Sequence, residues 1–123
     1  MRIFKNKLFS RWATEVEIED SDLVKAVREI GEGLYEANLG GFVYKKRVPL
    51  CGRGKSGGAR TIIAYKLDSK AIFIYGFAKN KMDNITVKEK HALKELAKIY
   101  FNYDHNQINH AVKVGELVEV KYE

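Results

Sequence analysis

Two strand-like segments, 61–67 and 71–79, are separated by only three residues in this chain of 123 residues. Both segments are rich in β-branched and aromatic residues, which favour extended backbone, and Asp68, Ser69 and Lys70 connect them. Because so short a connection joins antiparallel neighbours, the two segments predict a β-hairpin. A fold that contains this hairpin must contain an antiparallel sheet.

The segments before the hairpin predict a strand, two helices and a further strand. Residues 42–48 favour a strand, and Ile3 with Phe4 can form a short one. Apolar residues recur at helical spacing in two segments between them, which indicates two amphipathic helices. The first helix carries Leu8, Phe9 and Trp12, and the second, capped by Ser21, carries Leu23, Val27, Ile30 and Leu34.

Two capping boxes after the hairpin predict two more helices. In this pattern, a residue that caps a helix is followed three positions later by Glu or Gln. Thr86 with Glu89 and Asp104 with Gln107 both fit it. The second of these helices is expected to be short, and residues 117–122 alternate as a half-buried or edge strand does.

The predicted order is therefore β, α, α, β, β, β, α, followed by a short helix and a strand. This order is typical of an α+β domain in which a small, mostly antiparallel sheet packs against helices. With 123 residues the chain can build one modest hydrophobic core, so residues 1–123 are expected to form a single domain.

The composition limits the classes of function. No apolar stretch approaches the roughly 18 residues of a membrane span, and the N-terminus lacks the apolar segment of a secretory signal. We therefore expect a cytoplasmic protein that does not contact a membrane. The single cysteine, Cys51, cannot form an internal disulfide, and no spacing of His, Cys, Asp or Glu resembles a metal site. Neither a metal nor a cofactor is expected.

Positive charge is concentrated in residues 37–67. This window contains seven Lys and Arg residues and no acid, although the net charge of the whole chain is only +6. It runs from a basic strand at 45–47 through a glycine-rich loop at 52–58 to Arg60. A concentrated cationic surface of this kind indicates a polyanion as the partner.

The glycine-rich loop is not a nucleotide-binding P-loop, although Gly54, Lys55 and Ser56 match the last three positions of that motif. The first glycine of the motif would fall at Pro49, and a β-branched strand rather than a helix follows the loop. The glycines either let backbone N–H groups and the side chains of Arg53 and Lys55 approach a phosphate, or serve only as a flexible connection.

The hairpin register predicts where this charge gathers. A two-residue loop at Ser69 and Lys70 would place Arg60 directly opposite Lys79. Opposed like charges cost a few tenths to about 1 kcal/mol, so such a pair indicates an anion-binding role when more cations lie nearby. Alternatively, the two side chains extend separately into water. A loop one residue longer would shift the register and remove the pair.

Chemistry in the basic window would have to rely on lysine, arginine and Tyr75, because His91, His105 and His110 are distant in sequence. Such groups suit a transition state that is more negative than its substrate, as in cleavage of a phosphodiester by the neighbouring ribose 2′-hydroxyl. Crowding by like charges lowers the pKa of a lysine. This effect would make Lys55 or Lys79 usable for proton transfer.

The succession of a basic strand, the loop GRGKSGGAR, a β-branched strand, a short turn and IFIYGFAKN resembles the RelE/ParE superfamily of bacterial toxins. The likeness extends over most of the chain and is closest to the RelE and HigB branch of type II toxin–antitoxin systems. It implies a microbial-ribonuclease-type fold that binds the A site of the ribosome and cleaves mRNA without a metal. A cognate antitoxin would neutralise it. Residues 104–123 extend past the minimal family fold and are expected to be a C-terminal extension.

The resemblance implies roles for individual residues. Arg60 matches an arginine that stabilises the phosphate in the transition state, and Lys79 matches a basic residue that ends the next strand. Lys45 and Arg47 match the paired basic positions of the preceding strand. The expected catalytic residues are Arg60, Lys79, Lys55 and Lys45, and the expected RNA-binding or phosphate-binding residues are Arg47, Arg53, Tyr75, Phe77 and Asn80.

The chain departs from the family pattern at two positions. Asn80 stands where the resemblance implies an arginine, and Thr86 stands about where it implies a catalytic tyrosine. Tyr75, Arg53 and Lys55 are the candidates to substitute for them. Two other functions stay open: an RNA-binding or ribosome-binding module without catalysis, and a ParE-like inhibitor of DNA gyrase that acts through protein contact.

Overall fold

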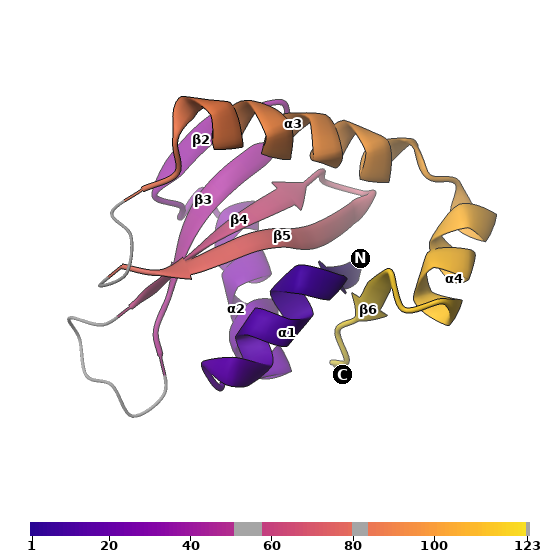
Figure 1. Cartoon of the computed structure of the whole chain (residues 1–123), viewed down its shortest axis with the longest axis horizontal. Helices are drawn as coiled ribbons and strands as arrows, with labels where there is room; N and C mark the ends of the chain where they lie inside the picture. Colours follow the sequence, from indigo (N-terminus) through magenta and orange to yellow (C-terminus); the bar gives the residue numbers. More distant parts are fainter. Residues whose placement is uncertain (51–57, 80–83, 123) are drawn as a thin grey trace.

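A six-stranded sheet lies between helices in the computed structural model, which describes residues 1–50, 58–79 and 84–122 (Figure 1). The strand order is β2-β3-β4-β5-β1-β6, in which β1 is parallel to β5 and every other neighbouring pair is antiparallel. The predicted α+β fold with a mostly antiparallel sheet is confirmed. The elements are β1 (Arg2–Asn6), α1 (Lys7–Glu15), α2 (Asp20–Gly31), β2 (Ala37–Gly40), β3 (Val43–Val48), β4 (Ala59–Tyr65), β5 (Lys70–Ala78), α3 (Val87–Asn102), α4 (His105–Lys113) and β6 (Leu117–Glu119).

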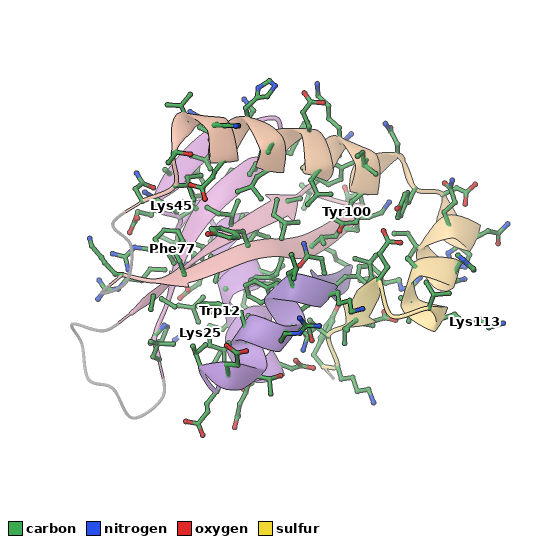
Figure 2. All side chains as sticks on the ribbon, in the orientation of Figure 1. Trp12, Lys25, Lys45, Phe77, Tyr100 and Lys113 are labelled. Carbon is green, nitrogen blue, oxygen red and sulfur yellow. The ribbon has the colours of Figure 1, made fainter. Side chains whose placement is uncertain are left out.

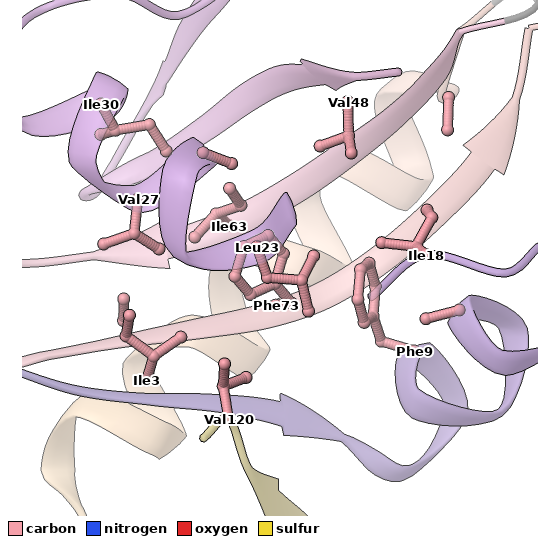
Figure 3. Close-up of a cluster of buried hydrophobic side chains, with 14 of the residues drawn as sticks. Ile3, Phe9, Ile18, Leu23, Val27, Ile30, Val48, Ile63, Phe73 and Val120 are labelled. Atoms are coloured by element: carbon pink, nitrogen blue, oxygen red, sulfur yellow. The ribbon is translucent and has the colours of Figure 1, made fainter. Parts of the chain in front are cut away.

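Each face of the sheet has its own hydrophobic core, because successive side chains of a strand point to opposite faces. The adjacent residues Ile62 and Ile63 of β4 illustrate this alternation, since they belong to different cores. On the face covered by α1 and α2, the core contains Phe9, Leu23 and Phe73 (Figure 3). On the other face, which α3 crosses, the core contains Phe4, Val43, Ile62, Ala64, Ile72, Ala97, Tyr100, Ile108 and Leu117.

The C-terminal elements α4 and β6 pack into the α3-side core. Ile108 of α4 and Leu117 of β6 are buried there, and β6 pairs with β1 at the edge of the sheet. Arg2 Nε lies 2.9 Å from Glu119 Oε2 across these two strands. Residues 105–119 therefore supply a helix, a strand and buried side chains to the sheet.

Both capping boxes predicted after the hairpin are present. Thr86 Oγ1 accepts a hydrogen bond from Glu89 N at 3.0 Å at the start of α3. Asp104 Oδ1 accepts one from Gln107 N at 2.8 Å at the start of α4. These are contacts between residues close in sequence, which explains why the pattern alone predicted them.

The segment before β3 differs from the prediction, and α2 ends at Gly31, before the exposed Leu34. The strand β2 was not predicted, because it has only four residues and ends at Gly40, whose φ is 87°. The start of α2 is capped by Glu19 in a capping box with Asp22, rather than by Ser21. Acidic side chains in a first turn also interact favourably with the positive end of the helix dipole.

The predicted hairpin is formed, but its predicted register is wrong. Ser69 N donates to Lys66 O at 3.0 Å, so the chain reverses over residues 66–69, and Asp68 adopts a φ of 62°. In addition, β5 has a bulge, because Ile62 pairs with Tyr75 whereas Ile63 pairs with Phe73. The turn and the bulge together pair Arg60 with Phe77 instead of Lys79.

Asp20 joins three distant parts of the chain. Its carboxylate accepts hydrogen bonds from Lys5 Nζ at 3.0 Å and from Lys121 N at 2.9 Å. Burial by itself would raise the pKa of this carboxyl, but the hydrogen bonds from Lys121 and Lys5 and their charges outweigh burial and lower the pKa. A carboxyl with a lowered pKa stabilises the folded state above its unfolded pKa and loses this effect as the pH falls through its folded pKa.

Asp20→Asn is therefore expected to lower the free energy of unfolding by about 1 kcal/mol at pH 7, because a half-exposed charged hydrogen bond is weakened by solvent. The difference from the wild type should shrink as the pH falls below about 4, where Asp carboxyls titrate. Urea unfolding at pH 7 and pH 3 measures both values. Glu95→Gln, at an exposed ion pair on α3, is the control. An equal difference for Asp20→Asn at both pH values would contradict this account.

Candidate functional site

Two rows of side chains cross strands β3, β4 and β5 on the α3 face of the sheet. The strand pairing aligns Lys45, Ile62 and Tyr75 in one row. It aligns Arg47, Arg60 and Phe77 in the next row. Directly opposed residues on one face have Cβ atoms about 4.5–5.5 Å apart. The register therefore gathers three cations and two aromatic rings, and we call Lys45, Arg47, Arg60, Tyr75 and Phe77 the cationic site.

The cationic site lies at the end of the sheet away from the core beneath the C-terminal half of α3. Ala97 and Tyr100 of α3 belong to the core that contains Val43, Ala64 and Ile72. Figure 2 shows Lys45 and Phe77 at one end of the sheet and Tyr100 towards the other. The segment that leads into α3 borders the site, because Lys45 Nζ lies 3.4 Å from Asn84 Oδ1.

Arg60 is a buried cation held by a carboxylate. Only 7% of the residue is exposed, and its Nε donates to Glu36, with Oε1 at 3.1 Å and Oε2 at 2.8 Å. Glu36 Oε1 also lies 3.2 Å from Lys45 Nζ. Burial would raise the pKa of Glu36, but the hydrogen bonds and charges of Lys45 and Arg60 outweigh burial and lower it. Glu36 is therefore ionised at neutral pH and bridges two cations of the site.

Sequence reasoning missed Glu36. The residue immediately precedes the acid-free window 37–67, and it contacts the cations because its backbone N–H donates to Lys45 O at 2.8 Å at the edge of the sheet. An acid that directly borders a basic segment is the signal that would have drawn attention to it.

Arg47 and Arg60 form the like-charge pair that was predicted for Arg60 and Lys79. They are directly opposed in the pairing of β3 with β4. Arg47 is exposed. Its side chain passes close to Gly58, because a Cβ built on that glycine would lie only 2.9 Å from Arg47 Nε. The register therefore places two arginines next to each other on the α3 face, with β3 rather than β5 as the source of the second cation, and Glu36 supplies a negative charge to Arg60.

The two aromatic rings of the site differ in exposure. Their centroids are 6.1 Å apart at an interplanar angle of 41°, but Phe77 is only 5% exposed, whereas Tyr75 is half-buried. Burial, with a contribution from the charge of Glu89, raises the pKa of the Tyr75 phenol. Tyr75 is thus a neutral, partly accessible phenol at neutral pH, and Phe77 is buried beside it.

A comparison with known protein families finds a match over almost the whole chain. The family described as the RelE toxin of the RelE/RelB toxin–antitoxin system matches residues 1–120. The chain belongs to the RelE toxin family. It is accordingly a toxin of a toxin–antitoxin system, and membership of the RelE family implies a cognate antitoxin. Among curated proteins, none matches the chain.

The remaining residues predicted for the site of this RelE toxin are not shown to join Lys45, Arg47 and Arg60. Lys79 is exposed just beyond the end of β5, and the register does not place it opposite Arg60. Arg53, Lys55 and Asn80 lie outside the described residues, so their predicted roles stay predictions.

Two cations of the basic window have other contacts in the RelE toxin. Lys46 points to the α2 side of the sheet, where its Nζ donates to Leu34 O at 2.8 Å and lies 3.0 Å from Glu29 Oε1. Lys66 Nζ lies 5.1 Å from the ring centroid of Phe42 and 5.9 Å from that of Phe101. The window is therefore a mixture of site residues and residues that stabilise the fold.

The three histidines of the RelE toxin, His91, His105 and His110, are all exposed. Within residues 1–50, 58–79 and 84–122, no three His, Cys, Asp or Glu side chains are arranged to hold a metal ion. Of the helices in these ranges, none combines the length and the apolar character that crossing a membrane requires.

Proposed function

We propose that this RelE toxin is a ribosome-dependent endoribonuclease that inhibits translation by cleaving mRNA, with side chains rather than a metal as its catalytic groups. The observation that carries the proposal is the alignment of Lys45, Arg47 and Arg60 on one face of the sheet beside Tyr75. RelE family toxins are generally endoribonucleases, which agrees with this function. The proposed reaction is attack of a ribose 2′-hydroxyl on the adjacent phosphodiester.

The buried Arg60 is suited to stabilise the transition state of this reaction. Attack of the 2′-hydroxyl produces a phosphorane that carries more negative charge than the substrate. A donor that is already oriented and shielded from water interacts more strongly with such charge than one in bulk water. We assign this role to Arg60, because it is buried and its Nε is held by Glu36.

The other cations and Tyr75 divide into proton transfer and RNA binding. We assign proton transfer to Lys45, with Lys79 and Lys55 as further candidates, and the anchoring of a flanking phosphate to the exposed Arg47 together with Arg53. Tyr75 is assigned to contact a base, since aromatic rings stack on unpaired bases. The ring of Phe77 packs against that of Tyr75 and holds it in place. Asn80 is assigned to RNA contact only because its position matches one in the family pattern.

The proposed partners follow from the proposed reaction. The substrate is mRNA in the ribosomal A site, so the toxin acts in the cytoplasm. The cognate antitoxin binds the toxin and neutralises it until the toxin is released. We propose that residues 1–123 form a single domain, with residues 104–123 as a C-terminal extension of the minimal family fold.

The proposed function is tested by inducing the toxin in cells and mapping the ends of transcripts, and by incubating purified toxin with mRNA with and without ribosomes. New transcript ends are expected, and in the purified system they should depend on ribosomes. Steeply salt-dependent RNA binding without cleavage would instead indicate a non-catalytic module. Loss of DNA supercoiling with initially normal translation would indicate a gyrase inhibitor.

Lys45→Met is expected to reduce the rate of mRNA cleavage about tenfold, because it removes one positive charge next to the reacting phosphate. Lys66→Met removes the same charge from the same sheet face, but Lys66 lies at the hairpin end, over the rings of Phe42 and Phe101. Its cleavage rate should stay within about twofold of the wild type. Equal losses in the two variants would mean that only the total charge matters, and would remove Lys45 from the site.

A further inference from the structure

Glu36 connects the two cations of the cationic site that lie on different strands and in different rows. Lys45 is on β3 in the row of Tyr75, and Arg60 is on β4 in the row of Phe77. One carboxylate contacts both, with Oε1 3.2 Å from Lys45 Nζ and Oε2 2.8 Å from Arg60 Nε. Without a carboxylate between them, two cations in this arrangement repel each other.

The three side chains are exposed to different extents. The side chains of Arg60 and Lys45 are 8% and 15% exposed, whereas that of Glu36 is 35% exposed. The backbone of Glu36 is tied to β3 by its hydrogen bond to Lys45 O at 2.8 Å. A carboxylate anchored at the sheet edge thus reaches inward to two cations that water solvates poorly.

Both carboxylate oxygens of Glu36 contact the Nε atom of Arg60. A guanidinium has further N–H donors on its two terminal nitrogens, in a planar arrangement that suits phosphate oxygens. The contacts of Glu36 are made at Nε, so Glu36 restrains the guanidinium of Arg60 without occupying its terminal nitrogens. Because two cations hold the pKa of Glu36 low, the carboxylate is a weak base and is better suited to orientation than to proton abstraction.

We propose that Glu36 is a positioning residue of the toxin, which orients Arg60 and Lys45 for a phosphate of the RNA and thereby sets the rate of the chemical step rather than the affinity for RNA. The proposal rests on the proposed endoribonuclease function. The negative charge of Glu36 beside a phosphate site weakens the binding of RNA. Glu36 therefore favours the reaction only if the gain in rate from orienting Arg60 and Lys45 exceeds this loss of affinity.

The chain provides a matched control on the opposite face of the same strand. Lys46 follows Lys45 on β3, and its Nζ lies 3.0 Å from Glu29 Oε1. A hydrogen bond from Lys46 lowers the pKa of Glu29, as the contacts with Lys45 and Arg60 do for Glu36. Glu29→Gln therefore removes an equivalent charge from an equivalent lysine pair outside the cationic site.

Glu36→Gln is expected to lower kcat for ribosome-dependent mRNA cleavage about tenfold, because misplaced reacting groups lose much of the benefit of preorganisation. KM should stay the same or fall, since a negative charge has been removed. Glu29→Gln should leave kcat within about twofold of the wild type. An unchanged or increased kcat for Glu36→Gln, or an equal decrease for Glu29→Gln, would overturn the proposal.

A second measurement does not depend on cleavage. The Nε–H of Arg60 should give a nitrogen-15 NMR signal that is protected from exchange in the wild type, because Glu36 accepts its hydrogen bond. Glu36→Ala should remove this protection. If the wild-type toxin cleaves no RNA, the proposed function fails, and the NMR signal still decides whether Glu36 orients Arg60. Retained protection in Glu36→Ala would refute the orientation itself.

Discussion

Arg60→Ala is expected to reduce mRNA cleavage by about two to three orders of magnitude, which is the usual effect of removing one donor that stabilises a developing oxyanion. Arg60 is the most buried cation of the cationic site, so solvent cannot readily replace its contribution. Cells that carry the variant should continue to grow on induction. The measurement is the single-turnover cleavage rate on ribosome-bound mRNA, together with mapping of transcript ends.

Two comparisons separate chemistry from folding in this experiment. Arg60→Lys keeps the charge but loses the planar guanidinium, so it should recover only part of the activity. Arg11→Ala, at an exposed position on α1, should cleave as the wild type does. Circular dichroism and thermal unfolding show whether each variant is folded. A folded Arg60→Ala variant with wild-type cleavage would contradict the role assigned to Arg60.

Gly76→Ala is expected to cause the largest loss of stability. A Cβ at this position of β5 would overlap the ring of Trp12 on α1, with Cη2 at 2.8 Å and Cε3 and Cζ3 still closer. Such overpacking typically costs 1–3 kcal/mol. Urea unfolding should therefore show a free energy of unfolding lower by about 2 kcal/mol.

A double-mutant cycle tests the cause of this loss. In a Trp12→Leu background the ring is absent, so Gly76→Ala should cost much less than it does in the wild type. A coupling energy of at least about 1 kcal/mol is expected for residues in direct contact. If Gly76→Ala changes stability by less than about 0.5 kcal/mol, or by the same amount in both backgrounds, the contact with Trp12 does not constrain this position.

The parts of the fold that the sequence predicted are those that depend on neighbouring residues. The capping boxes of Thr86 and Asp104 and the hairpin connection all act over a few residues. The short strand β2 was missed because four residues ending in glycine carry little pattern, and it is stabilised by pairing with β3. Pairing of this kind depends on the partner strand, which local preference does not describe.

The residues of the candidate site were likewise predicted only in part from the sequence. The cations on β3 and Arg60 were identified from the basic window and from the resemblance to the RelE/ParE superfamily, and the pairing of β3 with β4 places Lys45, Arg47 and Arg60 on one face. The predicted partner of Arg60 was wrong, since a turn at residues 66–69 and a bulge at Ile74 together changed the register. The resulting shift of two residues, from Lys79 to Phe77 opposite Arg60, is invisible to composition but decides which side chains meet.

Residue type and local order were enough to predict the class of the fold, the concentration of positive charge and the likeness to the RelE family. The tertiary structure alone decided that Arg47 rather than Lys79 opposes Arg60, that Phe77 is buried, and that Glu36 bridges Arg60 and Lys45. The physical reason is that strand register and ion pairing are set by contacts between segments distant in sequence. A carboxylate outside the basic window enters the site only when β2 pairs with β3.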